Sequence, residues 1–247
     1  MSRLSSFSPP LRCAVIGASG GIGAALLAAL LDEQRVTAVH ALCRRPPALA
    51  APRLHWNALD LGDESSIAAA AQIVGGDGPL DLVIVATGVL HDALARPEKR
   101  WEQLSAEALA HLFAVNAIGP ALCARHFLPL LRTDGKAVFA ALSARVGSIV
   151  DNRTGGWYGY RASKAALNQL LKTFALELAR RRPRAVCIGL HPGTVDTPLS
   201  QPFQQRVPSD RLFSPGRSAA CLLEVIDRAT PADSGQVFAW DGAPVPP

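Results

Sequence analysis

Short apolar runs alternate along the chain with longer segments in which apolar residues recur at helical spacing. The apolar runs predict seven strands, at Cys13–Ile16, Val36–Leu42, Leu54–Ala58, Leu82–Ala86, Ala137–Ser143, Ala185–Leu190 and Val237–Trp240. Between them lie segments that predict helices, among them Ile22–Leu31, Ser65–Val74, Ala106–Leu131, Tyr158–Arg181 and Pro215–Ile226. The strand runs are almost continuously apolar, which is expected where helices cover both faces of a sheet.

This alternation predicts an α/β fold with a doubly wound, seven-stranded parallel sheet and helices on both of its faces. A chain of 247 residues suits one substantial domain. No internal repeat, low-complexity linker or change of composition marks a second unit. We therefore expect residues 1–247 to form a single domain.

The composition provides a large core, since 49% of the residues are hydrophobic and only 18% are charged. No apolar stretch reaches the roughly 18 residues needed to cross a bilayer without a charge or a helix breaker. The first ten residues lack the apolar run of a signal peptide. We expect no membrane partner and a cytoplasmic location.

The net charge of +5 raises the question of nucleic acid as a partner. The basic residues are scattered, and the one tight run, 180–182, falls at the end of a predicted helix, where cations favour the helix dipole. We therefore expect no nucleic acid partner. The cysteines are odd in number and show no metal-ligand spacing, which predicts buried free thiols and no metal site: Cys13, Cys43, Cys123, Cys187 and Cys221.

A glycine-rich turn joins the first predicted strand to the first helix. Its glycines are Gly17, Gly21 and Gly23, with Ser19 and Ile22 between them. Glycine permits the tight turn, the approach of backbone to a pyrophosphate and close helix packing, while the helix N-terminus offers free N–H groups to phosphate. A P-loop is disfavoured because no Gly-Lys-Ser/Thr follows, and a purely structural glycine loop is the alternative. The turn predicts a dinucleotide site in a Rossmann fold.

The end of the second predicted strand bears on the choice of cofactor. NAD-binding proteins of this fold place a carboxylate about 20 residues beyond the glycines, to bond the ribose 2′-hydroxyl. Here that count from Gly23 reaches Cys43, which is followed by Arg44 and Arg45. Guanidinium groups make fork-shaped contacts with phosphate oxygens. This pattern favours NADP(H) over NAD(H), and a solvated basic strand end is the alternative.

Tyr160 and Lys164 stand four residues apart at the start of a long predicted helix, and therefore share a helical face. The phenol has an ordinary pKa near 10, so a nearby ammonium group is expected to lower this pKa and make Tyr160 a usable acid or base. Such a pair arises often by chance, and gains weight here because it follows the glycine turn in a β/α chain.

These motifs together resemble the short-chain dehydrogenase/reductase family over nearly the whole chain. The resemblance rests on the glycine turn, Asn116, a serine near 143, the Tyr160/Lys164 pair and the run 192–197. The run 155–168 and the ending 240–242 look like the C-factor/sniffer-type carbonyl reductase branch.

The resemblance implies roles for individual residues. Tyr160 would be the general acid/base, Lys164 would lower its pKa and bond the nicotinamide ribose, and Asn116 would hold a water in a proton relay. Asp60, beside Leu61, would bond the adenine. The remaining residues lie at or just beyond the ends of the predicted strands 82–86 and 185–190, and would contact the cofactor there: Ala86, Gly88, Pro192, Gly193, Val195 and Thr197.

One departure from the family concerns the catalytic serine. The family commonly has two adjacent serines at the end of the fifth strand, of which the second polarises the substrate carbonyl. Aligned on Gly147, this pair is Ser143-Ala144 here. We expect Ser143 to take over the role; Ser148, or a site working weakly without a serine, are the alternatives.

The sequence thus predicts an NADP(H)-dependent oxidoreductase of small carbonyl or alcohol substrates. A non-catalytic NADP-binding regulator and a nucleotide-sugar epimerase or dehydratase are the alternatives. Residues 198–215 fall where the family places a lid over the substrate. The helices predicted at 106–131 and 158–181 pair subunits in similar proteins, so a homodimer or homotetramer is expected.

Overall fold

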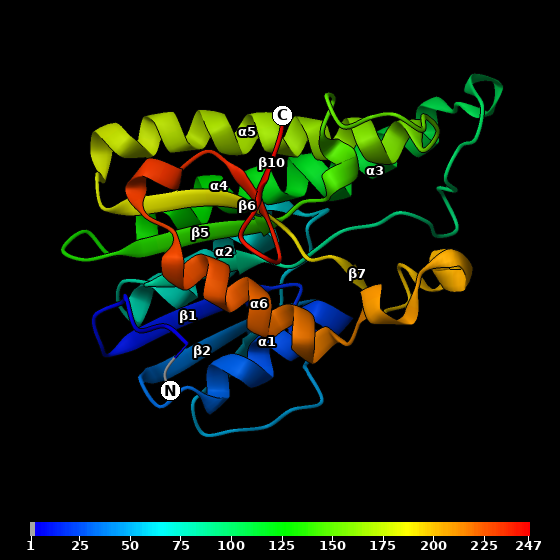
Figure 1. The fold of residues 1–247 in the computed structure, drawn as a ribbon. Coiled ribbons are helices and arrows are strands. Elements are labelled where there is room, and N and C mark those ends of the chain that lie inside the picture. The colour runs from blue at the N-terminus through cyan, green and yellow to red at the C-terminus, as the bar shows by residue number, and fades with distance from the viewer. Residues whose placement is uncertain (1–2) are drawn as a thin grey trace.

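The computed structural model describes residues 3–247, the side chain of Arg206 excepted. Its core is an eight-stranded sheet in the order β10-β9-β6-β5-β4-β1-β2-β3, in which all neighbours except β9 and β10 are parallel (Figure 1). The strands are β1 (Leu11–Ile16), β2 (Val36–Leu42), β3 (Leu54–Asn57), β4 (Leu82–Val85), β5 (Ala137–Leu142), β6 (Ala185–His191), β9 (Val237–Ala239) and β10 (Pro244–Val245).

Helices cover both faces of this sheet, as the continuous apolar strands predict. On one face, α1 (Gly21–Asp32) and α6 (Pro215–Arg228) pack side by side. On the other face lie α2 (Glu64–Gly76), α4 (Gly119–Phe127) and α5 (Tyr158–Arg181), with α3 (Ala106–Phe113) ahead of α4. A fully buried core fills each of the two layers, so the predicted doubly wound α/β architecture is confirmed.

Two details differ from the prediction. The sheet has an eighth strand, β10, which turns back antiparallel to β9 over only two residues and gives no periodic signal. The helix expected over 106–131 is divided by a π-helical turn, Ala114–Ile118, and it finishes in a 3-10 turn, Leu128–Leu130. The spacing of apolar residues indicates the buried face of a helix, but it does not reveal a local change in helical pitch.

The stretch Ala106–Leu130 is long and apolar enough, by length and composition, to cross a membrane. Within the fold it supplies layer helices instead, since α4 packs against α2 and α5 and contributes Cys123, Ala124 and Phe127 to the core. The cysteines are free thiols, and all except the half-buried Cys221 are buried, as predicted.

The carboxyl ends of the parallel strands all meet at one edge of the sheet. Consecutive strands lead away in opposite directions from the boundary between β1 and β4, and such a switch point is where α/β sheets bind ligands. Above this edge, a small parallel pair of strands, β7 (Thr194–Val195) and β8 (Leu212–Phe213), holds the base of the segment 198–211. We call residues 198–211 the lid segment.

Candidate active site

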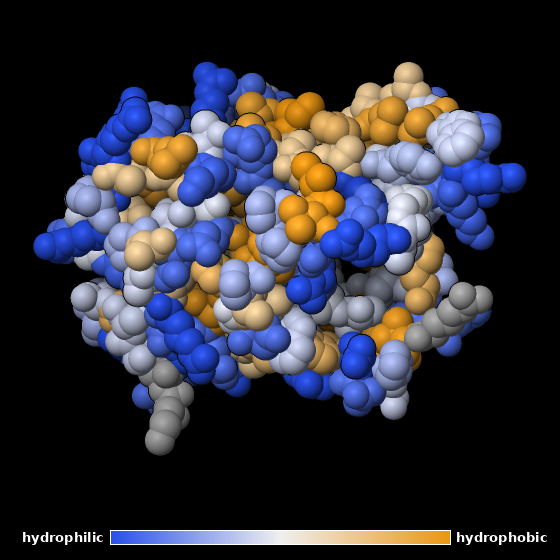
Figure 2. Space-filling model, turned by 45° about the horizontal axis from the view of Figure 1, so that its top comes forward, coloured by the Kyte–Doolittle hydropathy of each residue, from blue (hydrophilic) through white to orange (hydrophobic). Residues whose placement is uncertain are grey.

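A cleft of about 550 Å³ lies at the carboxyl edge of the sheet, beside the lid segment. A hollow is visible on this side of the molecule in Figure 2. Its wall includes many of the residues that the sequence predicts for cofactor binding and catalysis: Ser19, Gly21, Ile22, Ala86, Gly88, Ser143, Tyr160, Lys164, Pro192, Gly193, Val195 and Thr197. The fold therefore brings residues from five separate stretches of the chain into one cavity.

The glycine turn is as tight as its sequence predicts. Gly17 has a φ of +84°, and a Cβ there would lie 2.9 Å from the carbonyl oxygen of Ala86. A Cβ on Gly23 would lie 2.1 Å from the carbonyl oxygen of Gly17, which no side chain can tolerate. Gly17 and Gly23 lie outside the cleft wall and shape the turn behind it, whereas Gly21 and Ile22 line the cleft.

The residues around this turn fit a dinucleotide cofactor. The N-cap of α1 is Gly20, which supplies no side-chain cap, and the first turn carries no acidic side chain, so the backbone N–H groups are available to an anion. The hydroxyl of Thr87, in the cleft wall opposite, is buried without a hydrogen-bond partner. A buried hydroxyl of this kind is costly unless a ligand group satisfies it.

Three further predicted cofactor contacts lie beyond the cleft wall, namely Arg44, Asp60 and Leu61. Arg44 is exposed just past the carboxyl end of β2, and no hydrogen bond or ion pair of its side chain occurs within residues 3–247. Asp60 is also exposed and accepts a hydrogen bond from Gly62 N–H at 2.9 Å, while the neighbouring Leu61 packs against the α2–α4 layer. Their roles toward a cofactor stay predictions.

Tyr160 and Lys164 both lie in the cleft wall and project from the same face of α5, as their spacing predicts. Lys164 is 2% exposed, its Nζ donates to the carbonyl oxygen of Leu142 at 2.8 Å, and the ammonium lies 5.9 Å from the centre of the Tyr160 ring. Close approach of the β5–α5 connection to α5 needs Gly147, because a Cβ there would lie 2.9 Å from Cβ of Lys164.

Asn116 occupies the π-helical turn and is fully buried. Its Nδ2 donates to Val89 O at 2.8 Å and to Ser163 Oγ at 3.1 Å, while its Oδ1 accepts from Val89 N–H at 2.9 Å. A Cβ on Gly88 would lie 3.5 Å from both Asn116 Oδ1 and Lys164 Nζ, so glycine keeps the space between these two groups open. The water relay through Asn116 stays a prediction.

Burial dominates the electrostatics of the pair. It raises the pKa of Tyr160 to about 12 and lowers the pKa of Lys164 to about 7, because a low-dielectric surrounding disfavours the charged form of each group. The sequence predicts that the ammonium lowers the pKa of Tyr160, and in the structure the burial of the phenol outweighs this. At neutral pH the phenol keeps its proton.

The serine expected to polarise a carbonyl has a different partner. Ser143 lines the cleft, but its hydroxyl donates to Asn168 Oδ1 on α5 at 2.6 Å. Ser148 donates to the carbonyl oxygen of Pro247 at 3.2 Å and is not part of the cleft wall. Ala144 lines the cleft but has no polar side-chain group. Among residues 143–148, therefore, no serine in the cleft has a free hydroxyl to offer a substrate. A role for Ser143 stays a prediction.

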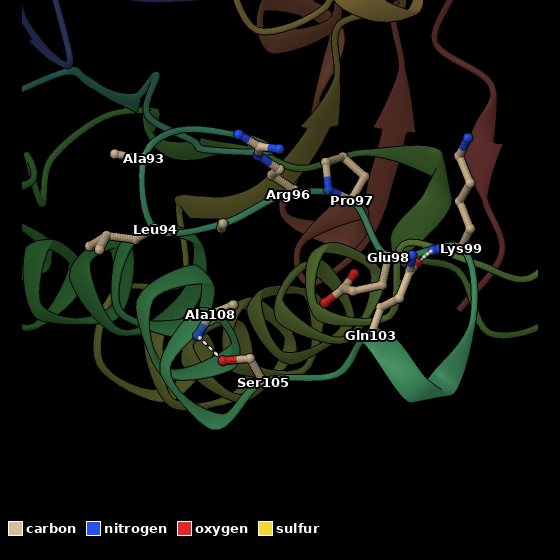
Figure 3. Close-up of a pocket in the computed structure, with 10 residues that line it drawn as sticks. Ala93, Leu94, Arg96, Pro97, Glu98, Lys99, Gln103, Ser105 and Ala108 are labelled. Carbon is tan, nitrogen blue, oxygen red and sulfur yellow. Dashed lines mark hydrogen bonds between the residues drawn. The ribbon is translucent and has the colours of Figure 1, made fainter.

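Glu98 holds the start of α5, and no local sequence signal indicates it. Its backbone oxygen accepts from Trp157 N–H at 2.5 Å, and its buried carboxylate lies 3.3 Å from Gly159 N–H. A carboxylate at a helix N-terminus interacts favourably with the helix dipole. A second cavity of about 480 Å³ lies beside Glu98, between residues 93–99 and the start of α3 (Figure 3). That cavity contains none of the predicted catalytic side chains.

Comparisons with known proteins agree with this geometry. A family model described as short chain dehydrogenase matches residues 12–208. The C-signal protein of Myxococcus xanthus is 34% identical over 170 residues, which cover 68% of this chain and 93% of that protein. NADPH-bound carbonyl reductase from chicken fatty liver superposes with a TM-score of 0.83 at 25% identity, covering 99% of this chain and 97% of the other. Carbonyl reductase Sniffer of D. melanogaster has the same fold, with a TM-score of 0.83 at 24% identity over 97% of this chain and all of its own.

Proposed function

Because this chain belongs to the short-chain dehydrogenase/reductase family of oxidoreductases, and is of its C-factor/sniffer type, we propose that it reduces a small carbonyl compound with NADPH. The observation that carries this proposal is the single cleft in which the glycine turn and the Tyr160/Lys164 pair face one cavity. NADPH is the cofactor bound in the chicken carbonyl reductase, which supports the same choice here.

The chain's residues divide the work of holding the cofactor. The N-terminus of α1 would bind the pyrophosphate, and Arg44 would bind a ribose 2′-phosphate, since this exposed guanidinium has no other partner in residues 3–247. Asp60 would bond the adenine, and residues 192–197 would line the nicotinamide, with the Val195 backbone at its carboxamide. The bound cofactor supplies a hydride to the carbonyl carbon.

Tyr160 would supply the proton that the carbonyl oxygen needs. Reduction requires a protonated donor, and the pKa of about 12 keeps the phenol protonated at neutral pH. Lys164 would replace that proton or stabilise the phenolate left behind, because its Nζ lies 5.9 Å from the centre of the Tyr160 ring and its pKa of about 7 permits exchange near neutral pH. Asn116 would hold a water in a proton relay, in the space that Gly88 keeps open.

Because residue 144 is alanine, polarisation of the substrate carbonyl would also fall to Tyr160. A hydrogen-bond donor aimed at a developing oxyanion contributes to rate, and a serine at this position would supply one. With Ser143 bonded to Asn168, the phenol is the donor that the geometry favours for the substrate oxygen. We propose that the enzyme relies on Tyr160 for both proton transfer and polarisation.

A regulatory or signalling role is the second candidate, and the name of the Myxococcus relative supports it. Such a role needs cofactor binding but no turnover.

We further propose a cytoplasmic homo-oligomer formed through the α4–α5 layer, where Ile118 and Leu176 are 52% and 56% exposed. Sedimentation of the purified protein tests this assembly directly.

A product assay tests the proposed activity. The protein is incubated with NADPH that carries deuterium at the transferable C4 position and with a panel of aldehydes and ketones. We expect an alcohol with deuterium on its carbinol carbon, formed faster with NADPH than with NADH. Tight binding of NADPH with no alcohol from any carbonyl would favour the signalling role and reject the reductase.

A further inference from the structure

The substrate end of the cleft contains a row of aromatic rings. Trp157 and Phe203 both line the cleft, with ring centres 5.1 Å apart and planes inclined by 57°. Trp157 also meets Tyr160 edge to face, at 6.4 Å between centres. The row thus runs from the proton donor out to the lid segment, whose apolar Leu199 and Val207 also line the cleft.

The backbone holds Trp157 in this position at a cost. Trp157 has φ +53° and ψ +43°, a left-handed conformation that bulky side chains avoid, and Gly155 and Gly156 before it also have positive φ. Its N–H is fixed by Glu98 O at 2.5 Å. Strain of this kind persists where the side chain has a use, and here it aims an indole into the cleft.

Phe203 has a second aromatic contact, with His91. His91 meets its ring edge to face at 5.7 Å, and His91 Nε2 lies 3.1 Å from Leu199 O and 3.2 Å from Pro198 O. These contacts tie the lid segment to the loop after β4. The rings of Trp157 and Phe203 are therefore held in position before any substrate binds.

The charged groups of the cleft argue against an acidic substrate. Arg145 is engaged with Asp151 at 2.9 Å, and Lys164 donates to a backbone carbonyl deep in the wall. His191 is neutral at pH 7, because burial lowers its pKa to about 4. Among the described residues that line the cleft, no other cationic side chain is available to bind a carboxylate or a phosphate.

We propose that the substrate is an uncharged aryl ketone or aldehyde whose ring packs against Trp157 and Phe203 while its carbonyl oxygen faces Tyr160. This inference rests on the proposed reductase function. Aromatic rings prefer edge-to-face or offset contacts at about 4.5–7 Å, and Trp157 and Phe203 offer a substrate ring such partners because both line the cleft.

Two methyl ketones of equal carbon number test the proposal: acetophenone and cyclohexyl methyl ketone. We expect the wild-type KM for acetophenone to be about tenfold lower, since only its ring gains the aromatic contacts. Phe203→Leu and Trp157→Leu should each raise the KM for acetophenone about tenfold and change the KM for the cyclohexyl ketone by less than about twofold. Trp101→Leu, at a 71% exposed site outside the cleft, is the matched control and should leave both KM values unchanged.

The outcomes separate the two proposals. NADPH binding measured by fluorescence confirms that each variant is folded, and Phe203→Leu carries the test if Trp157→Leu does not fold. Equal KM values for the two ketones in the wild type, or equal changes in both on Phe203→Leu, would overturn the aryl assignment and leave the reductase function standing. Reduction of other carbonyl compounds without any turnover of aryl ketones or aldehydes would also overturn the aryl assignment and leave the reductase function standing. No turnover of any carbonyl would overturn both.

Discussion

The cofactor end of the cleft is built mainly from backbone, whereas the substrate end is built from side chains that separate loops bring together. At the first, the turn at Gly17–Gly23 leaves no room for a side chain at Gly17 or Gly23, and Gly20 at the N-cap of α1 has none. At the second, Trp157 and Phe203 line the cleft from two separate segments, and the Phe203 ring contacts both Trp157 and His91.

This difference explains what each end can recognise. A backbone cradle suits a ligand whose pyrophosphate never changes, because N–H groups and glycines cannot vary without breaking the turn. A wall of loop side chains can change by single substitutions while the scaffold remains. Tyr160 and Lys164 lie at the boundary between the two ends, on the first turns of α5.

The largest effect should come from filling the backbone cradle. Gly23→Ala places a Cβ 2.1 Å from Gly17 O, so we expect a loss of about 1–3 kcal/mol in the free energy of unfolding and no measurable NADPH binding. Urea unfolding and NADPH fluorescence measure the two effects. Gly216→Ala, in α6 with nothing within 4 Å of the new Cβ, is the control and should be neutral or stabilising by up to about 1 kcal/mol. Wild-type unfolding and binding in Gly23→Ala would show that the turn is not tight.

A smaller effect should follow at Arg44, the side chain predicted to bind the 2′-phosphate of the cofactor. Arg44→Ala removes a charge-assisted contact with the 2′-phosphate, so we expect NADPH to bind about 10- to 100-fold more weakly. NADH, which lacks this phosphate, should bind with unchanged affinity. Arg180→Ala, at an exposed site near the far end of α5, is the matched control. Equal losses for NADPH and NADH would contradict the assignment of Arg44.

The smallest expected effect is a pH dependence at the boundary residue Lys164. Burial lowers its pKa from 10.5 to about 7, so between these values the unfolded chain binds more protons than the folded one. The free energy of unfolding should therefore rise with pH in this window, on the order of 1 kcal/mol per pH unit. Urea unfolding at pH 7 and pH 9 should show this rise in the wild type and a weaker one in Lys164→Met. Parallel curves would mean that Lys164 is not desolvated.

The sequence predicts the cofactor end far better than the substrate end. The glycines, the continuous apolar strands and the Tyr160/Lys164 spacing are local patterns, and each has a local physical meaning. Three features depend on contacts between segments far apart in the chain: the π-helical turn at Asn116, the hydrogen bond from Trp157 N–H to Glu98 O, and the partner of Ser143. The two-residue strands β7, β8 and β10 are too short to show a period.

Tyr160 is the residue on which the proposed chemistry depends most, and the chain's other tyrosine, Tyr158, offers a matched control two residues away. NADPH oxidation is measured at saturating cofactor with the best carbonyl of the panel for the wild type, Tyr160→Phe and Tyr158→Phe. We predict that Tyr160→Phe lowers kcat by about 10²- to 10⁴-fold while NADPH still binds, and that Tyr158→Phe turns over like the wild type. Turnover of Tyr160→Phe at the wild-type rate would contradict the assignment of Tyr160 as the proton donor.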